Sequence, residues 1–397
     1  MKLVSRKTAA HPSAEAQRRL SYFNERRDAI VSTIGELVEI ESPSDNKAAV
    51  DRIADAVAQK FSPLGGEVRI HPAKDFGNHL QVNFAGKSTK PVLLLGHYDT
   101  VDPLGTLAAM PCRANDNQLT GPGVLDMKSG IALMLHALAA LQDWNKEDRH
   151  GGLPRPVTVL LVSDEEVGSD SSRAITESLA KKAAAVLVLE PSYGLQGAVK
   201  TARKGVGEYL VKVAGKASHA GLDFQKGVNA ILELARQIQK VSSFTEIKKG
   251  LTVNVGVVSG GSRTNVVPAE ASAQVDVRIA RMKDAAGIDK KMRSLRPFNR
   301  KCRIEITGGI NRPPMERTAG VAALYAQAAA IARDLGWKLG EAAVGGGSDG
   351  NFTAGLGIPT LDGLGAVGDG AHAPHEHILI SELPRRAALL AGLIETA

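Results

Sequence analysis

The spacing of hydrophobic positions changes between helical and extended several times along the chain. Apolar residues recur every three or four positions in the predicted helices, and they run together or alternate in the predicted strands. The predicted helices are residues 14–40, 48–61, 127–141 and 319–335 and a last helix from Ser381, and the predicted strands are residues 67–71, 80–84, 92–95, 157–162 and 186–189. Strands that alternate with helices predict an α/β domain with a mixed, mostly parallel sheet that helices cover.

The pattern differs in the middle of the chain. Here the predicted order is strand, helix, two strands, helix and strand, which is the order of a ferredoxin-like α+β unit. These elements are residues 208–213, 228–241, 251–258, 271–279, 282–295 and 303–307. We therefore predict an α/β domain made of residues 1–200 and 313–397, interrupted by an inserted domain of residues 201–312.

The composition is that of an ordinary soluble globular protein, with 43% hydrophobic and 23% charged residues over 397 positions. The 49 basic and 42 acidic residues give a net charge of +7, but the charges are scattered and aromatic residues make up only 4%. This argues against a nucleic-acid partner, which needs a basic patch and stacking platforms. No run approaches 18 apolar residues, and residues 1–7 lead into no apolar segment, so we expect neither a membrane span nor a signal peptide.

The chain has two cysteines, Cys112 and Cys302, which lie far apart and outside any C-x-x-C spacing. Neither a disulfide framework nor a thiolate zinc site is predicted from them. Free thiols suit a reducing compartment, so we expect a cytoplasmic protein.

Polar side chains follow the apolar strands of the α/β domain. His97 and Asp99 follow the segment 92–95, and because they are two residues apart in an extended chain they share a face, where Asp99 can fix the histidine tautomer. The other candidates are Asp126 in a Gly-rich loop, the triplet Asp164-Glu165-Glu166, Glu190 and His372. Taken singly, Asp126 also fits a helix N-cap, the triplet a solvated loop, and Glu190 a turn residue.

Taken together, these strand ends predict a metal site. Open α/β sheets bind ligands at the carboxyl ends of their strands. Carboxylates and imidazoles without thiolates suit zinc, cobalt or manganese in a hydrolytic site. Two histidines and three carboxylates are enough for two metal ions if one carboxylate bridges them.

Several long motifs, in order, resemble those of the M20 metallopeptidases, and among these the glutamate carboxypeptidase (carboxypeptidase G2-like) branch. They are Gly96-His97-Tyr98-Asp99-Thr100-Val101, Gly121-Pro122-Gly123-Val124-Leu125-Asp126-Met127-Lys128-Ser129-Gly130, Asp164-Glu165-Glu166-Val167-Gly168-Ser169, Glu190-Pro191, Gly215-Lys216-Ala217-Ser218-His219-Ala220-Gly221 and Gly345-Gly346-Gly347-Ser348-Asp349. The resemblance covers nearly the whole chain from about Ile30. It implies a zinc-exopeptidase-like catalytic domain interrupted by a ferredoxin-like dimerisation (lid) domain.

The resemblance also implies a role for each residue of the metal site. His97 and Glu190 are implied as ligands of one zinc ion, and Glu166 and His372 as ligands of the other, with Asp126 bridging both. Glu165 is implied as the general base, Asp99 as the partner that orients His97, and the peptide bond between Asp126 and Met127 as cis. His372 is chosen over His375 because Glu376, four residues further on, fits the family pattern.

In the inserted domain, His219 resembles the histidine that polarises the scissile carbonyl from the partner subunit of a homodimer. Asn265 and Arg278 resemble substrate-binding groups, and an arginine is suited to hold a free α-carboxylate with two hydrogen bonds. Gly347 and Ser348 belong to a loop that we expect to line the substrate pocket. The same loop satisfies G-x-G-x-x-G, but too short a segment follows it for a dinucleotide-binding helix.

The resemblance thus predicts a hydrolase with two zinc ions per subunit, or cobalt or manganese in their place. Its substrate is expected to be a small peptide or N-acyl amino acid, cleaved at the amide bond to a C-terminal amino acid such as glutamate. One alternative is an N-acyl or N-carbamoyl amino-acid amidohydrolase, which shares all the metal residues. An alternative from another class is a non-catalytic relative that binds peptides or amino acids.

Overall fold

The computed structural model describes residues 12–147 and 153–397, which form two compact units. The first unit contains the chain up to Thr201 together with Arg317–Ala343 and Ser348–Ala397, and the second contains Ala202–Glu316 and Val344–Gly347. The second unit therefore extends beyond the predicted residue 312. It also includes Val344–Gly347, predicted in the first domain, because the main-chain N–H of Lys204 donates to the carbonyl of Val344 at 3.0 Å.

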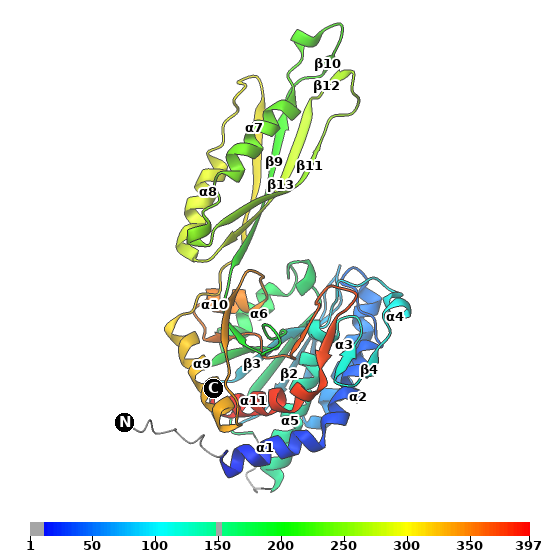
Figure 1. Cartoon of the computed structure of the whole chain (residues 1–397), viewed down its shortest axis with the longest axis vertical. Coiled ribbons are helices and arrows are strands. Elements are labelled where there is room, and N and C mark those ends of the chain that lie inside the picture. The colour runs from blue at the N-terminus through cyan, green and yellow to red at the C-terminus, as the bar shows by residue number, and fades with distance from the viewer. Residues whose placement is uncertain (1–11, 148–152) are drawn as a thin grey trace, which may run out of the picture. The chain divides into compact units, whose positions relative to one another are not determined.

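The first unit is built on a six-stranded sheet (Figure 1). The strands, in spatial order, are β1 (Glu67–His71), β2 (His79–Phe84), β6 (Val157–Val162), β3 (Val92–His97), β7 (Ala185–Val188) and β16 (Thr360–Leu361). Strands β6, β3, β7 and β16 pair in parallel, whereas β1 with β2 and β2 with β6 pair antiparallel. The predicted mixed, mostly parallel sheet is confirmed.

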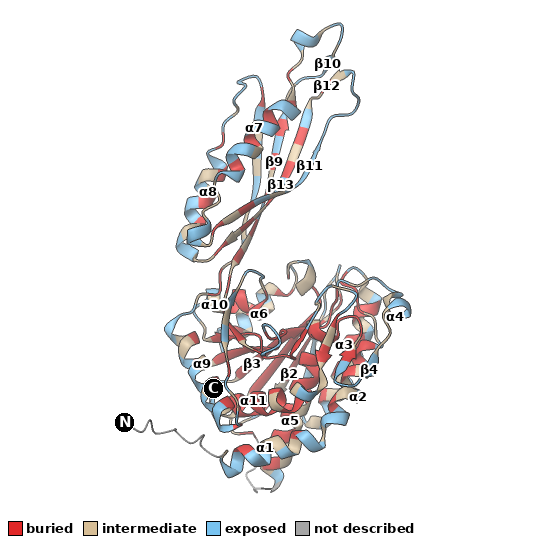
Figure 2. Cartoon of the chain, viewed as in Figure 1, coloured by how far each residue is buried: buried red, intermediate tan, exposed pale blue. Residues whose placement is uncertain are grey.

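Helices bury both faces of this sheet, which explains why its central strands are continuous apolar runs. Alternate residues of β3 point to opposite faces: Leu94 belongs to a core with the long helices, and Leu93 and Leu95 belong to a core beside α6. The helices of this unit are α1 (Ala14–Glu25), α2 (Arg27–Val38), α3 (Lys47–Phe61), α4 (Thr106–Ala109), α5 (Ser129–Glu147), α6 (Arg173–Ala180), α9 (Ala319–Asp334), α10 (Gly350–Gly355) and α11 (Leu383–Thr396). Figure 2 shows the buried positions gathered in the sheet and in α11.

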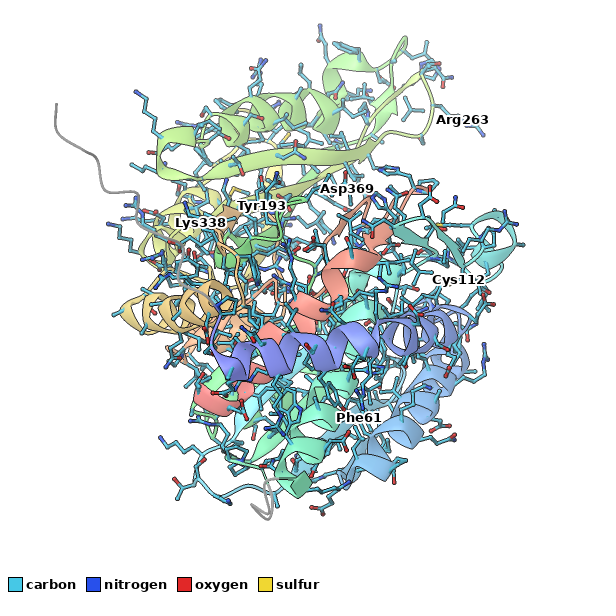
Figure 3. The ribbon with its side chains drawn as sticks, turned by 60° about the horizontal axis from the view of Figure 1, so that its bottom comes forward. Phe61, Cys112, Tyr193, Arg263, Lys338 and Asp369 are labelled. Carbon is cyan, nitrogen blue, oxygen red and sulfur yellow. The ribbon has the colours of Figure 1, made fainter. Side chains whose placement is uncertain are left out.

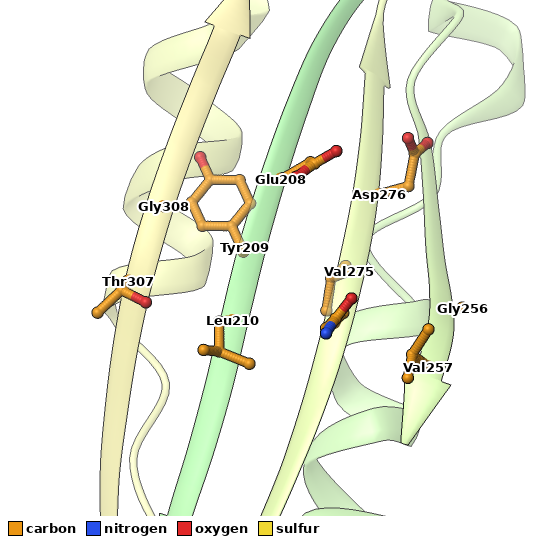
Figure 4. A pocket seen from close by; sticks show the side chains of 10 residues that line it. Glu208, Tyr209, Leu210, Gly256, Val257, Val275, Asp276, Thr307 and Gly308 are labelled. Carbon is orange, nitrogen blue, oxygen red and sulfur yellow. The ribbon is translucent and has the colours of Figure 1, made fainter. Parts of the chain in front are cut away.

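The second unit is a four-stranded antiparallel sheet with two helices against one face. The chain order is β9 (Gly205–Ala214), α7 (Ala230–Ser242), β11 (Thr252–Gly260), β13 (Glu270–Ile279), α8 (Ala285–Arg293) and β14 (Arg303–Arg312). The strands lie in the order β11-β13-β9-β14, as in a ferredoxin-like unit. The other face carries an open hollow of about 460 Å³ lined by residues of all four strands (Figure 4). A short ribbon of β10 (Ser218–His219) and β12 (Val266–Val267) completes the unit.

Three expectations from the sequence concern a membrane span, the two cysteines and the first seven residues. Within the described residues, Val124–Lys146 is long and apolar enough to cross a membrane, although no such segment was predicted, and 83% of its most apolar window is buried inside the protein. Cys112 and Cys302 are both free, and Cys112 is partly exposed (Figure 3). Residues 1–7, predicted to lead into no signal segment, lie outside the described residues.

Candidate metal centre

The sheet brings the predicted ligands to one edge. Strands β3, β6 and β7 are parallel and in register, so their carboxyl ends coincide. His97 is the last residue of β3, Glu165 and Glu166 begin the turn after β6, and Glu190 lies two residues beyond β7. The remaining two come from turns: Asp126 from the segment Val124–Lys128, and His372 from the loop between β17 (Gly368–Asp369) and β18 (His377–Leu379).

Asp126 lies between two separate histidine–carboxylate pairs. Its Oδ1 is 3.2 Å from Nε2 of His97, whose Nε2 is also 3.5 Å from Oε1 of Glu190. Its Oδ2 is 3.5 Å from Nε2 of His372, whose Nε2 is also 3.1 Å from Oε1 of Glu166. One carboxylate thus presents one oxygen to each pair, which is the arrangement that a bridging ligand needs.

The charges around the two imidazoles favour a bound cation. Hydrogen bonds to Asp126 and Glu166 raise the pKa of His372 to about 11. Burial lowers the pKa of His97, but the carboxylates of Asp126, Asp99 and Glu190 outweigh it and raise the pKa well above its ordinary value. Both shifts have the same origin, an excess of negative charge. Divalent cations that prefer nitrogen and oxygen ligands, such as zinc, would neutralise it, so the residues present fit a metal.

The carboxylate of Glu165 lies near the same candidate metal position as that of Glu190. Ligand atoms of His97, Glu165 and Glu190 lie within 4.8 Å of one another, and so do those of His97, Asp126 and Glu166. The geometry therefore places Glu165 beside the ligands, where a general base for a metal-activated water must be.

Asp99 connects the two strand ends, as well as contacting the imidazole. Nδ1 of His97 lies 3.0 Å from the main-chain oxygen of Asp99 and 3.4 Å from its Oδ1. The buried carboxylate also accepts hydrogen bonds from the main-chain N–H groups of Glu165, at 3.3 Å, and Glu166, at 3.2 Å, and from Ser44 Oγ at 2.7 Å. Asp99 thus contacts the imidazole of His97 and holds the turn that carries Glu165 and Glu166.

Glu376 holds the loop that carries Asp126, a role that was not predicted from the sequence. Its carboxylate accepts hydrogen bonds from the main-chain N–H groups of Gly123, Leu125 and Asp126, at 2.7 to 2.9 Å. Burial raises its pKa to about 7, although these hydrogen bonds lower it. The sequence signal for Glu376 was the motif spacing that selected His372, because Glu376 follows His372 by four positions.

Two backbone features lie at the ligands. The peptide bond between Asp126 and Met127 is cis, which confirms that prediction. His372 has φ of 62°, a left-handed conformation that residues other than glycine seldom adopt and that often occurs at functional sites.

The predicted residues of the second unit are not brought into this cluster by any described contact, and their roles stay predictions. His219 is exposed, and its Nδ1 accepts hydrogen bonds from the main-chain N–H groups of Gly221 and Leu222. Asn265 is exposed in the loop that contains Arg263 (Figure 3). Arg278 already holds a carboxylate, that of Asp276, with its Nε 3.0 Å from both oxygens.

The role of Gly347 and Ser348 in a substrate pocket stays a prediction, and both residues make contacts inside the protein. Ser348 is fully buried, and its Oγ donates to Oδ2 of Asp362 at 2.6 Å. The carbonyl of Gly347 accepts a hydrogen bond from Nη1 of Arg203 at 3.0 Å. Both groups therefore bind residues outside their own loop.

A covered α/β sheet with this ligand set at its carboxyl edge defines a metal-dependent hydrolase. Residues 93–396 match the family described as Peptidase family M20/M25/M40, and the chain belongs to that family. It is 31% identical over 381 residues to carboxypeptidase G2 of a Pseudomonas species, covering 93% of this chain and 89% of that protein.

Solved structures show the same fold. Aminopeptidase PepT of Bacillus cereus matches with a TM-score of 0.77 at 23% identity, over 93% of this chain and 98% of that one. The M20 family metallo-carboxypeptidase Sso-CP2 of Sulfolobus solfataricus matches with a TM-score of 0.72 at 18% identity, over 92% and 98%. A dinuclear metal-binding M20 peptidase of Bacillus subtilis, YXEP, matches with a TM-score of 0.69 at 14% identity, over 94% and 98%.

Proposed function

We propose that the chain is a dinuclear zinc hydrolase that cleaves the amide bond to a C-terminal amino acid, with glutamate as the released residue. The observation that carries the proposal is the position of Asp126, whose two oxygens face His97 with Glu190 on one side and His372 with Glu166 on the other. Each side offers a nitrogen, its own carboxylate and one oxygen of the shared carboxylate, which suits one ion per side.

In this proposal His97, Glu190, Glu166, His372 and Asp126 would hold two ions, which would supply Lewis-acid activation of a water molecule and of the scissile carbonyl. Glu165 accepts a proton from the water that attacks the carbonyl carbon, and it then gives this proton to the leaving amine nitrogen. Asp99 keeps Glu165 in place through the main-chain hydrogen bond at 3.3 Å. Arg278 binds the α-carboxylate of the substrate in exchange for Asp276, and Asn265 assists it.

The substrate assignment is supported by the 31% identity to carboxypeptidase G2 over most of both chains. An N-acyl or N-carbamoyl amino-acid amidohydrolase would use the same metal residues. Retention of Glu165 beside a complete ligand set favours an enzyme over a binding protein, since binding alone requires no base.

We further propose that the protein is a homodimer formed through the second unit, in which His219 of one subunit serves the metal centre of the other. Strand β11 is an edge of the four-stranded sheet, and Val257 and Val258 on it are 52% and 55% exposed. An edge strand with unpaired main-chain groups and exposed apolar side chains is suited to pair with its copy.

Rates of amide hydrolysis test the substrate assignment. One panel varies the released amino acid of N-benzoyl amino acids, and a second keeps glutamate and replaces the benzoyl group by a carbamoyl group or an amino acid. We expect the highest kcat/KM for release of glutamate from acyl or peptidyl substrates. Preference for N-carbamoyl substrates would favour the amidohydrolase, and no turnover of any compound by zinc-loaded protein would favour the binding protein.

A further inference from the structure

The first unit contains a fully buried arginine outside the metal centre. Arg386 on α11 is 0% exposed, and within residues 12–147 and 153–397 no carboxylate pairs with it. Its guanidinium donates instead to three main-chain carbonyls, from Nε to Gly365 at 2.8 Å, from Nη1 to Gly197 at 3.0 Å and from Nη2 to Gly363. Burial lowers its pKa to about 9, so it stays charged at neutral pH. Such a costly group calls for a role beyond packing.

The carbonyls that Arg386 holds belong mainly to a segment that runs beside the ligand Glu190. Residues 363–366, here called the strap, lie beside residues 188–192 and form main-chain hydrogen bonds with them. The N–H of Leu364 donates to the carbonyl of Val188 at 3.1 Å, the N–H of Gly365 to that of Glu190 at 2.8 Å, and the N–H of Ser192 to that of Ala366 at 3.0 Å. Gly365 therefore joins Glu190 through its N–H and Arg386 through its carbonyl.

The strap lies close against the backbone of Leu189 and Glu190. A Cβ atom on Gly365 would lie 2.3 Å from the carbonyl oxygen of Leu189 and 2.7 Å from that of Glu190, so only glycine allows this approach. Gly363, at the start of the strap, has φ of 74°, which also favours glycine. The strap is thus held between the backbone of Glu190 and the guanidinium of Arg386.

We propose that Arg386 is a positioning residue for the metal ligand Glu190. By fixing the strap it fixes the backbone of Glu190, and so it sets the affinity for the ion beside His97 without acting on the ion beside Glu166 and His372. The planar guanidinium reaches three carbonyls in fixed directions, which a lysine ammonium does not do, so Arg386→Lys keeps the charge and loses the positioning. This inference rests on the proposed dinuclear site.

Stepwise cobalt titration followed by visible absorption tests the proposal, because cobalt reports on the ligand geometry of each ion. Wild-type protein is expected to bind two equivalents. In Arg386→Lys one equivalent should bind about tenfold more weakly, as for other groups that orient a ligand, while the other stays within about twofold. The matched control is Arg385→Lys: this neighbour pairs with Glu382 and lies over the ring of Trp337, and its change should leave both affinities unaltered.

A double-mutant cycle identifies the ligand through which Arg386 acts. Glu190→Gln should weaken the same equivalent, and adding Arg386→Lys to it should cause little further loss, because the two changes remove one effect. Ser192→Ala is a milder change at the contact with the strap, since it removes only the hydrogen bond from Oγ to the carbonyl of Ala366 at 3.1 Å. It should weaken the binding of that equivalent to a smaller degree, and this measurement tests the proposal if Arg386→Lys does not fold.

Equal weakening of both ions, or unchanged affinities with a lower urea midpoint, would show that Arg386 only stabilises the fold and would overturn the proposal. Wild-type protein that binds fewer than two ions would overturn the proposed function as well. The two failures are therefore distinguishable in one titration.

Discussion

Glu165 and Glu166 are neighbours in one turn, yet the proposed chemistry gives them different tasks. In Glu165→Gln the base is removed while the five ligands remain, so hydrolysis should fall by about 10²- to 10⁴-fold with unchanged metal content. Rate measurements on metal-analysed protein check this. Asp170→Asn, an exposed carboxylate in the same loop, serves as control and should retain full activity. Full activity of Glu165→Gln would show that another group accepts the proton.

His372 and His375 lie three residues apart, and the structure distinguishes them. Nε2 of His372 is 3.1 Å from Glu166 and 3.5 Å from Asp126, whereas the exposed His375 has no described contact with a ligand atom. His372→Ala should therefore lose one metal equivalent, and His375→Ala should lose none. Metal analysis after dialysis measures both, and the reverse result would make His375 the ligand.

Among the helices, α5 contains a histidine whose burial gives a stability that depends on pH. Burial lowers the pKa of His136 to about 4. As the pH falls below about 6.5, the unfolded chain takes up a proton at this residue and the folded chain does not until about pH 4. Stability therefore decreases across that range.

In His136→Gln this source of pH dependence is absent. Its free energy of unfolding should fall less between pH 7 and pH 5 than that of the wild type. Urea denaturation in the presence of a chelator measures the difference without interference from metal binding. His375→Gln, at an exposed position, should behave as the wild type. Identical losses in His136→Gln and the wild type would mean that His136 is protonated in the folded protein.

Helices and strands could be predicted from the sequence where the pattern of their own apolar residues shows which sides are buried. The apolar run Val92–Leu95 predicts a strand buried on both faces, and it is one, because every side chain of such a strand meets a core. Its abrupt end in His97 and Asp99 locates the functional edge. The predicted helix 14–40, by contrast, is interrupted at Arg26, a break that the apolar periodicity does not reveal.

What the sequence could not predict depends on main-chain hydrogen bonds between distant segments. Glu376 binds three N–H groups some 250 positions earlier in the chain. Arg386 contacts carbonyls 189, 23 and 21 positions away. A side chain that binds carbonyls or N–H groups has no partner residue type that a pattern can identify. The burial of Ser348 was missed for a different reason, because its side-chain partner Asp362 lies in another turn.

For the whole molecule, the proposed dimer predicts a mass of two chains in sedimentation. Val257→Lys places a charge on the exposed edge strand β11 and should shift the protein toward monomer. Val68→Lys is the matched control, since Val68 is 36% exposed on β1, an edge strand of the first unit, and should leave the mass unchanged. A monomer at all concentrations, or a dimer insensitive to Val257→Lys, would contradict pairing through β11.

The most direct measurement of the proposed function is metal content together with amide hydrolysis on the same sample. The purified protein is expected to hold two zinc-class ions per chain, to lose hydrolysis of N-acyl glutamate when a chelator removes them, and to recover it on addition of zinc or cobalt. Asp126 and the four ligands around it predict this stoichiometry. Protein that binds no such ion and hydrolyses no amide after reconstitution with zinc or cobalt would contradict it.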